Sequence, residues 1–224
     1  MDFVNKKEDM KVLIGCEYSG IVRDAFSRMG WDAWSCDILP TESELTIQEG
    51  KHYQCDIFEV LYQDWDLLIA FPPCTYLSFA YTGKERYSIE RLQNKINAYQ
   101  FFLNLWSAPI NHICLENPIG YIHSGLLPYS QIVNPYYFGD NYKKKTGLWL
   151  KNLPSLMWSD DRTLFHEKTS VVPEYLLVGG SGKRAKLPEK YSGKSTAKLK
   201  SKFHKGIANA MSEQWTEYIK NYKK

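Results

Sequence analysis

The sequence predicts an α/β fold built on a mostly parallel, twisted sheet with helices on both faces. Short apolar segments typical of buried strands alternate along the chain with segments of helical periodicity. One of them, "WDLLIA" at 65–70, is a continuous apolar run, which is characteristic of a central parallel strand. Such alternation implies right-handed crossovers between parallel neighbours. We therefore expect functional residues beyond the carboxyl ends of the strands.

The first half of the chain begins with a strand, a helix and a second strand. The first strand starts at Lys11 and runs into a turn, and the helix that follows ends at Gly30. The second strand, in "DAWSC", ends at Asp37, and Asp56 lies in a similar place after a less regular strand or loop. The helix has one apolar face, formed by Ile21, Val22, Ala25, Phe26 and Met29.

The second half contains two helices and two further strands. The strands are expected in "NHICLENP", which Pro118 closes, and in "TGLWL". The clearest helix covers 88–106, and its apolar residues recur at alternating steps of three and four: Ile89, Leu92, Ile96, Tyr99, Leu103 and Trp106. A closing helix, "GIANAMSEQWTEYIK", gathers the following residues on one side: Ile207, Ala210, Met211, Trp215 and Ile219.

Length and composition fit a single globular unit of 224 residues with three parts. These are a core at 1–153, a small basic segment at 154–203, and a closing helix at 204–224 that packs back on the core. No stretch of about 18 apolar residues predicts a membrane span, and the polar N-terminus lacks a signal peptide, so we expect a cytoplasmic protein. The five cysteines are odd in number and widely spaced, which argues against a disulfide framework or a metal site.

Two glycines and an acid at the first strand ends suggest a nucleotide-binding edge. Gly15 and Gly20 flank a strand–turn–helix junction, although the segment does not match GxGxxG, and an ordinary tight turn explains both glycines equally well. An acid that ends the second strand of such a sheet commonly binds ribose hydroxyls. For Asp37, a surface carboxylate is an equally good interpretation.

The segment "FPPCTYLS" places Cys74 directly after two prolines at the end of a strand. The prolines fix the backbone and make a stiff corner that orients the thiol. Glu116 follows 42 residues later, after one crossover helix, so both residues are expected side by side at one sheet edge. A carboxyl there is partly desolvated, which raises its pKa and suits it to acid catalysis. The alternatives are a buried apolar cysteine and a structural carboxylate.

"FPPCTYLS" followed by "LENP" resembles the cytosine-C5 DNA methyltransferase family. The resemblance implies a Rossmann-like, S-adenosylmethionine-dependent methyltransferase fold, a thiolate of Cys74 that attacks C6 of cytosine, and a protonated Glu116 that holds N3. It implies cofactor contacts from Gly15, Glu17, Ser19, Gly20, Asp37, Asp56 and Pro72. It implies substrate contacts from Pro73, Ser78, Asn117, Lys143, Lys144 and Lys145.

The chain departs from the family pattern in two places. Only about 50 residues replace the usual target-recognition region, as in compact phage-like members, and lysines stand where paired arginines are usual. These departures leave three possibilities open: methylation of duplex DNA with a flipped base, methylation of single-stranded DNA or nucleotides, and binding without turnover. Amino-methyltransferases are disfavoured, because Phe71 stands where they place a hydrogen-bonding Asp or Asn.

The segment 181–205 carries nine Lys or Arg residues and one acid. One interpretation is a solvated loop, and the other is a segment that binds the phosphates of DNA. Tyr191 and Phe203 lie in the same segment and could stack on bases. The lysines expected to contact the substrate are Lys194, Lys198, Lys200 and Lys202.

Overall fold

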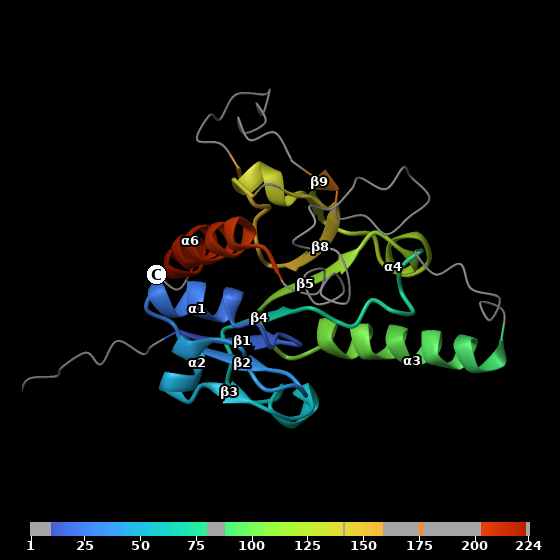
Figure 1. The fold of residues 1–224 in the computed structure, drawn as a ribbon, viewed down its shortest axis with the longest axis horizontal. Helices are drawn as coiled ribbons and strands as arrows, with labels where there is room; N and C mark the ends of the chain where they lie inside the picture. Colours follow the sequence, from blue (N-terminus) through green and yellow to red (C-terminus); the bar gives the residue numbers. More distant parts are fainter. Residues whose placement is uncertain (1–9, 80–87, 141, 159–174, 177–202, 223–224) are drawn as a thin grey trace, which may run out of the picture.

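The computed structural model describes residues 10–79, 88–140, 142–158, 175–176 and 203–222. Its main feature is a seven-stranded sheet with the strand order β3-β2-β1-β4-β5-β8-β6 (Figure 1). The strands are β1 (Lys11–Gly15), β2 (Asp32–Cys36), β3 (His52–Tyr53), β4 (Leu67–Ala70), β5 (His112–Pro118), β6 (Gln131–Val133) and β8 (Thr146–Lys151).

Strands β1 to β5 are parallel, and β8 runs antiparallel between β5 and β6. The chain winds outward from β1 to β3 and then returns to add β4 and β5 on the other side of β1. The winding direction therefore reverses between β1 and β4, which is where open α/β sheets bind ligands. The predicted α/β class is confirmed: the chain has a Rossmann-like fold with a mostly parallel sheet and helices on both faces.

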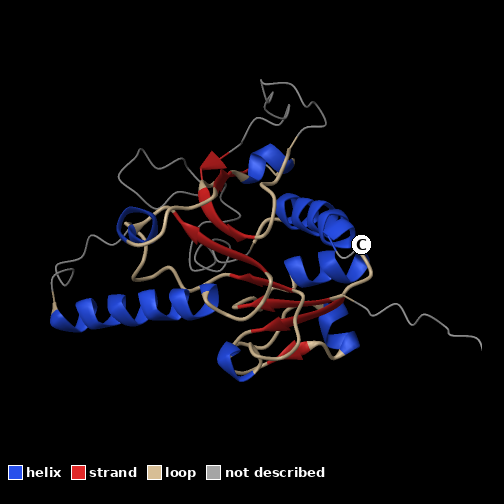
Figure 2. Cartoon of the chain, turned by 180° about the vertical axis from the view of Figure 1, so that it is seen from behind, coloured by secondary structure: helices blue, strands red, loops and turns tan. Residues whose placement is uncertain are grey.

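Helices cover both faces of the sheet (Figure 2). On one face, α1 (Ile21–Arg28) and α6 (Lys205–Tyr222) pack side by side and share a buried core with Val12, Ile14 and Ile69. On the other face, α3 (Ile89–Trp106) buries Phe102 and Leu105 in a second core. Two shorter helices are α2 (Glu44–Glu49) and α4 (Tyr121–Gly125). None of the described helices has the length and apolar character of a membrane span.

Helix α1 begins directly after the turn that follows β1. Its N-cap, Gly20, has φ 69°, and a Cβ there would collide with Ser43, so the turn needs glycine. The predicted apolar face is correct for Val22, Ala25 and Phe26, which are buried. It is wrong for Met29, because the helix ends at Arg28 and Met29 is an exposed C-cap.

The predicted apolar stripe of α3 is wrong in its first half. Ile89, Leu92 and Ile96 are 87%, 58% and 50% exposed, whereas Phe102 and Leu105 are fully buried. The helix extends beyond the edge of the sheet, so that only its second half packs on β5 and its neighbours (Figure 1). Tyr99 and Trp106, in the second half of the predicted stripe, do pack against this core, and periodicity alone does not show where along the helix the sheet stops.

Helix α6 packs as its periodicity predicts. Its predicted side is buried, and two tryptophans connect it to the rest of the core. The indole of Trp31 donates to Thr216 Oγ1 at 2.7 Å, and the indole of Trp215 donates to the carbonyl of Pro154 at 3.0 Å. A two-stranded sheet pairs β7 (Tyr142–Lys143) with β9 (Tyr175–Leu176). Most of 154–203 lies outside the described residues, so the division into three parts stays a prediction.

Candidate active site

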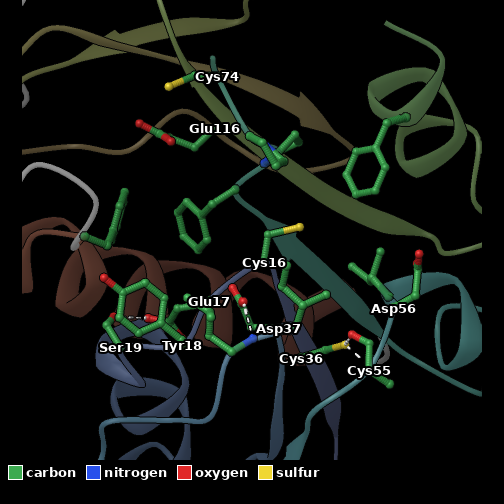
Figure 3. Close-up of a pocket in the computed structure, with 18 of the residues that line it drawn as sticks. Cys16, Glu17, Tyr18, Ser19, Cys36, Asp37, Cys55, Asp56, Cys74 and Glu116 are labelled. Carbon is green, nitrogen blue, oxygen red and sulfur yellow. Dashed lines mark hydrogen bonds between the residues drawn. The ribbon is translucent and has the colours of Figure 1, made fainter. Parts of the chain in front are cut away.

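A cavity of about 470 Å³ opens beyond the carboxyl ends of the parallel strands (Figure 3). Its size and largely apolar walls are those of a small-molecule site. Every parallel strand from β1 to β5 contributes to it through the residues that follow or end the strand. The predicted residues that line it are Glu17, Ser19, Asp37, Asp56, Pro72, Pro73, Cys74, Glu116 and Lys144.

The turn after β1 is held together by the carboxylate of Glu17. This carboxylate accepts hydrogen bonds from the Ser19 hydroxyl at 3.0 Å and from the backbone N–H groups of Val22 and Arg23 at 2.8 and 3.3 Å. Burial raises the pKa of Glu17 to about 7, although these bonds oppose the shift. A Cβ at Gly15 would meet the end of the Ile57 side chain, so a larger residue there would require Ile57 to shift. Glu17 therefore shapes this wall, whereas Gly15 and Gly20, also expected to contact the cofactor, are not among the residues that line the cavity.

Asp37 and Asp56 line the part of the cavity near β2 and β3. One oxygen of Asp37 accepts from the backbone N–H of Leu39 at 2.9 Å. Asp56 caps a short 3₁₀ turn by accepting from the N–H of Phe58 at 2.9 Å. Two carboxylates on neighbouring strand ends form an acceptor set that suits the hydroxyl and amine donors of a nucleoside.

Three thiols that sequence reasoning did not assign to the site also line it: Cys16, Cys36 and Cys55. Cys36 Sγ lies 3.9 Å from Cys55 Sγ. Cys16 has φ 57°, and burial raises the pKa of its thiol to about 12. The Cys16 thiol is therefore neutral near pH 7 and contributes a soft apolar wall and not a nucleophile.

Cys74 and Glu116 lie next to one another at the opposite end of the cavity from Asp56 (Figure 3). Burial raises the pKa of the half-buried Cys74 thiol, the negative charge of Glu116 raises it further, and Lys144 opposes both. Burial also raises the pKa of Glu116, with Lys144 and a hydrogen bond from the Thr146 hydroxyl opposing the shift. The structure thus brings together a thiol, a carboxyl and an ammonium group.

The Pro-Pro corner is fixed from behind by Asn117. This residue is 1% exposed, and its amide donates to the carbonyl of Pro72 at 2.7 Å. The carbonyl of Cys74 accepts from the N–H groups of Leu77 and Ser78 at 3.1 and 3.0 Å. Asn117 and Ser78, both expected to contact substrate, are not among the residues that line the cavity, and both instead hold the loop that presents Cys74.

The predicted lysines separate into three groups. Lys144 lines the cavity, whereas Lys143 and Lys145 are exposed and lie outside its lining. Lys194, Lys198, Lys200 and Lys202 fall outside the described residues. Phe203, expected to stack on bases from the basic segment, instead lines the cavity, where its ring centroid lies 4.7 Å from that of Phe71. No local signal in the sequence indicated this pairing.

Comparison with known proteins gives likenesses in structure but none in sequence. No protein-family model matches the chain, and no curated protein is similar to it in sequence. Among solved structures, the crystal structure of S. pombe Dnmt2 methyltransferase is similar with a TM-score of 0.46 and 19% sequence identity. The similarity covers 65% of this chain and 52% of that chain, so the match extends over about half of the length of that structure.

Proposed function

We propose that the protein is an S-adenosylmethionine-dependent methyltransferase that methylates C5 of cytosine in DNA through a covalent adduct with Cys74. One observation carries the proposal: a single cavity joins the acids Asp37 and Asp56 at one end to Cys74 and Glu116 at the other. A cofactor and a base held at these two ends would meet within one enclosed space.

The residues of the cavity fit S-adenosylmethionine. The volume of about 470 Å³ is in the range of small-molecule sites. Asp37 would accept from the ribose hydroxyls and Asp56 from the adenine amine, with exposed Ile38 and Leu39 available as apolar contacts. When bound, the cofactor supplies an electrophilic methyl group.

Cys74 would act as the nucleophile and Glu116 as the acid. A thiolate of Cys74 would add to C6, while the protonated carboxyl of Glu116 donates to N3 and stabilises the charge that the addition creates. The raised pKa of Glu116 favours this protonated form near neutral pH. Lys144 would favour the thiolate, because its charge lowers the pKa of Cys74. Attack on C6 requires access to the face of the base, so a duplex target must be flipped out.

The proposal is tested by incubating the protein with labelled S-adenosylmethionine and separate pools of duplex DNA, single-stranded DNA, RNA and nucleotides. We expect label at C5 of cytosine in a DNA pool, and none with Cys74→Ser. A substrate carrying 5-fluorocytosine should be trapped on Cys74, because loss of the C5 proton is blocked. An adduct found by mass spectrometry on Cys16, Cys36, Cys55 or Cys114 would contradict the assignment.

A second candidate is a protein of the same fold that binds the cofactor or nucleic acid without turnover. It is favoured by the raised pKa of Cys74, which leaves the resting thiol protonated. The lysines that stand in place of the usual arginines also favour binding without turnover. Calorimetric binding of S-adenosylmethionine together with no label transfer to any pool would select this candidate.

A further inference from the structure

Two phenylalanine rings line the same cavity as the acids and the thiol. Phe71 directly follows β4, and its backbone N–H donates to the carbonyl of Gly15 at 3.0 Å. Phe203 comes from the other end of the chain, directly before α6. The ring centroids are 4.7 Å apart with the planes tilted by 48°. Both rings are partly buried against the core shared by α1 and α6, and both line the cavity.

The strand order fixes what each part of the cavity would meet. Along the sheet edge the order is Asp56 after β3, Asp37 after β2, the turn after β1, Phe71 after β4, and Glu116 on β5. In S-adenosylmethionine the adenine, the ribose and the sulfonium follow one another, and the methyl group projects from the sulfonium toward its acceptor. With the nucleoside on the acids and the acceptor at Cys74, the sulfonium falls at the level of β4, beside Phe71 and Phe203.

Three charged or titratable residues of this region provide no binding site for a positively charged ligand group: Glu17, Lys144 and His204. Glu17, an acid that lines the cavity, uses its carboxylate to hold the turn after β1. Lys144, which also lines the cavity, is itself a cation. His204, adjacent to Phe203, is buried and its pKa is lowered to about 3, so it is neutral near pH 7. Aromatic faces attract cations through their quadrupole, most strongly where water is excluded.

We propose that Phe71 and Phe203 recognise the positive charge of the sulfonium and so make the cavity prefer S-adenosylmethionine over its neutral, demethylated product. This inference rests on the proposed function. The pair of rings would also assist turnover. Once the methyl group has left, the remaining thioether has no charge to interact with the rings, so the product is released more easily.

The test compares two ligands that differ in this charge. Calorimetry would measure S-adenosylmethionine and S-adenosylhomocysteine on wild type, Phe71→Leu and Phe203→Leu. We expect the leucine variants to weaken S-adenosylmethionine about three- to ten-fold more than the thioether, the range of a cation–π contact. Fluorinated phenylalanines at position 203 keep the ring shape, and successive fluorines should weaken only the charged ligand. They keep the proposal testable if leucine disturbs the fold.

Phe138→Leu is the matched control, since Phe138 packs against the same core but does not line the cavity. It should change neither affinity. Equal losses of both ligands in the Phe71 and Phe203 variants, or no loss, would overturn the inference while leaving the proposed function intact. A wild-type protein that binds neither ligand would instead overturn the proposed function, and the inference with it.

Discussion

At the scale of single residues, the site depends on how Cys74, Glu116 and Lys144 share protons. The proposed reaction needs a thiolate and a protonated carboxyl at once, yet burial raises the pKa of both groups. Raising the pH increases the thiolate fraction and decreases the protonated carboxyl fraction. The rate should therefore rise, pass through a maximum and fall, with both limbs belonging to the coupled pair.

Removing one charge at a time should move the pKa of Cys74 in opposite directions. Glu116→Gln removes a negative charge that raises the thiol pKa, so the pKa should fall. Lys144→Met removes a positive charge that lowers it, so the pKa should rise. Alkylation of Cys74 by iodoacetamide, followed against pH by mass spectrometry, measures both shifts. Shifts of the same sign in the two variants would show that the charges do not act on the thiol as described.

Asp37→Ala should weaken the binding of S-adenosylmethionine by about 1–3 kcal/mol, the cost of an unmet charged hydrogen bond. Calorimetry with the charged and the demethylated cofactor measures the loss, which should be equal for both because the ribose is the same. Asp64→Ala serves as the control, since Asp64 is exposed in the loop that precedes β4. Unchanged affinity in Asp37→Ala would remove this carboxylate from the cofactor site.

At the scale of secondary-structure elements, sequence reasoning found the strand ends better than the helix faces. Cys74, Glu116 and Asp37 follow or end apolar runs, and parallel strand ends share an edge, so their meeting in one cavity was predictable. The exposure of the first half of α3 was not predictable, because burial along the helix depends on where the sheet stops. Phe203 was expected to stack on bases and Asn117 to contact substrate. Their observed roles could not be predicted, because Phe71 lies far from Phe203 in sequence and Asn117 bonds to the carbonyl of Pro72.

The two halves of α3 should respond differently to substitution. Phe102→Ala removes a fully buried ring and should lower the free energy of unfolding by about 3–5 kcal/mol. Leu92→Gln changes a side chain that is 58% exposed and should alter it by no more than about 0.5 kcal/mol. Urea denaturation followed by tryptophan fluorescence measures both. A large loss in Leu92→Gln would mean that this half of α3 is covered in solution.

At the scale of the whole molecule, positive charge is concentrated in one segment of the sequence. The net charge is only +3, yet 181–205 alone carries nine Lys or Arg residues. Contacts between clustered lysines and phosphates release counterions, so the affinity for DNA should fall steeply with salt. The segment lies largely outside the described residues, and its role stays a prediction.

Changing Lys194, Lys198, Lys200 and Lys202 together to Gln should weaken DNA binding and flatten its salt dependence, with the affinity for S-adenosylmethionine unchanged. Fluorescence anisotropy with labelled DNA at several salt concentrations measures the slope. As the control, exchanging four exposed lysines from elsewhere, among them Lys220, should have a smaller effect. Binding equal to wild type at every salt concentration would argue for a nucleotide-sized substrate.

The bond between Trp31 and Thr216 joins residues 185 positions apart, and Phe203 completes a cavity whose other walls come from residues 16–144. During synthesis, the first strands and α1 therefore leave the ribosome long before the helix that covers them exists. Their apolar face stays exposed, or bound by a chaperone, until α6 emerges. Cofactor binding should consequently be acquired in a single late step of chain synthesis, and a nascent chain halted before Phe203 should capture no S-adenosylmethionine.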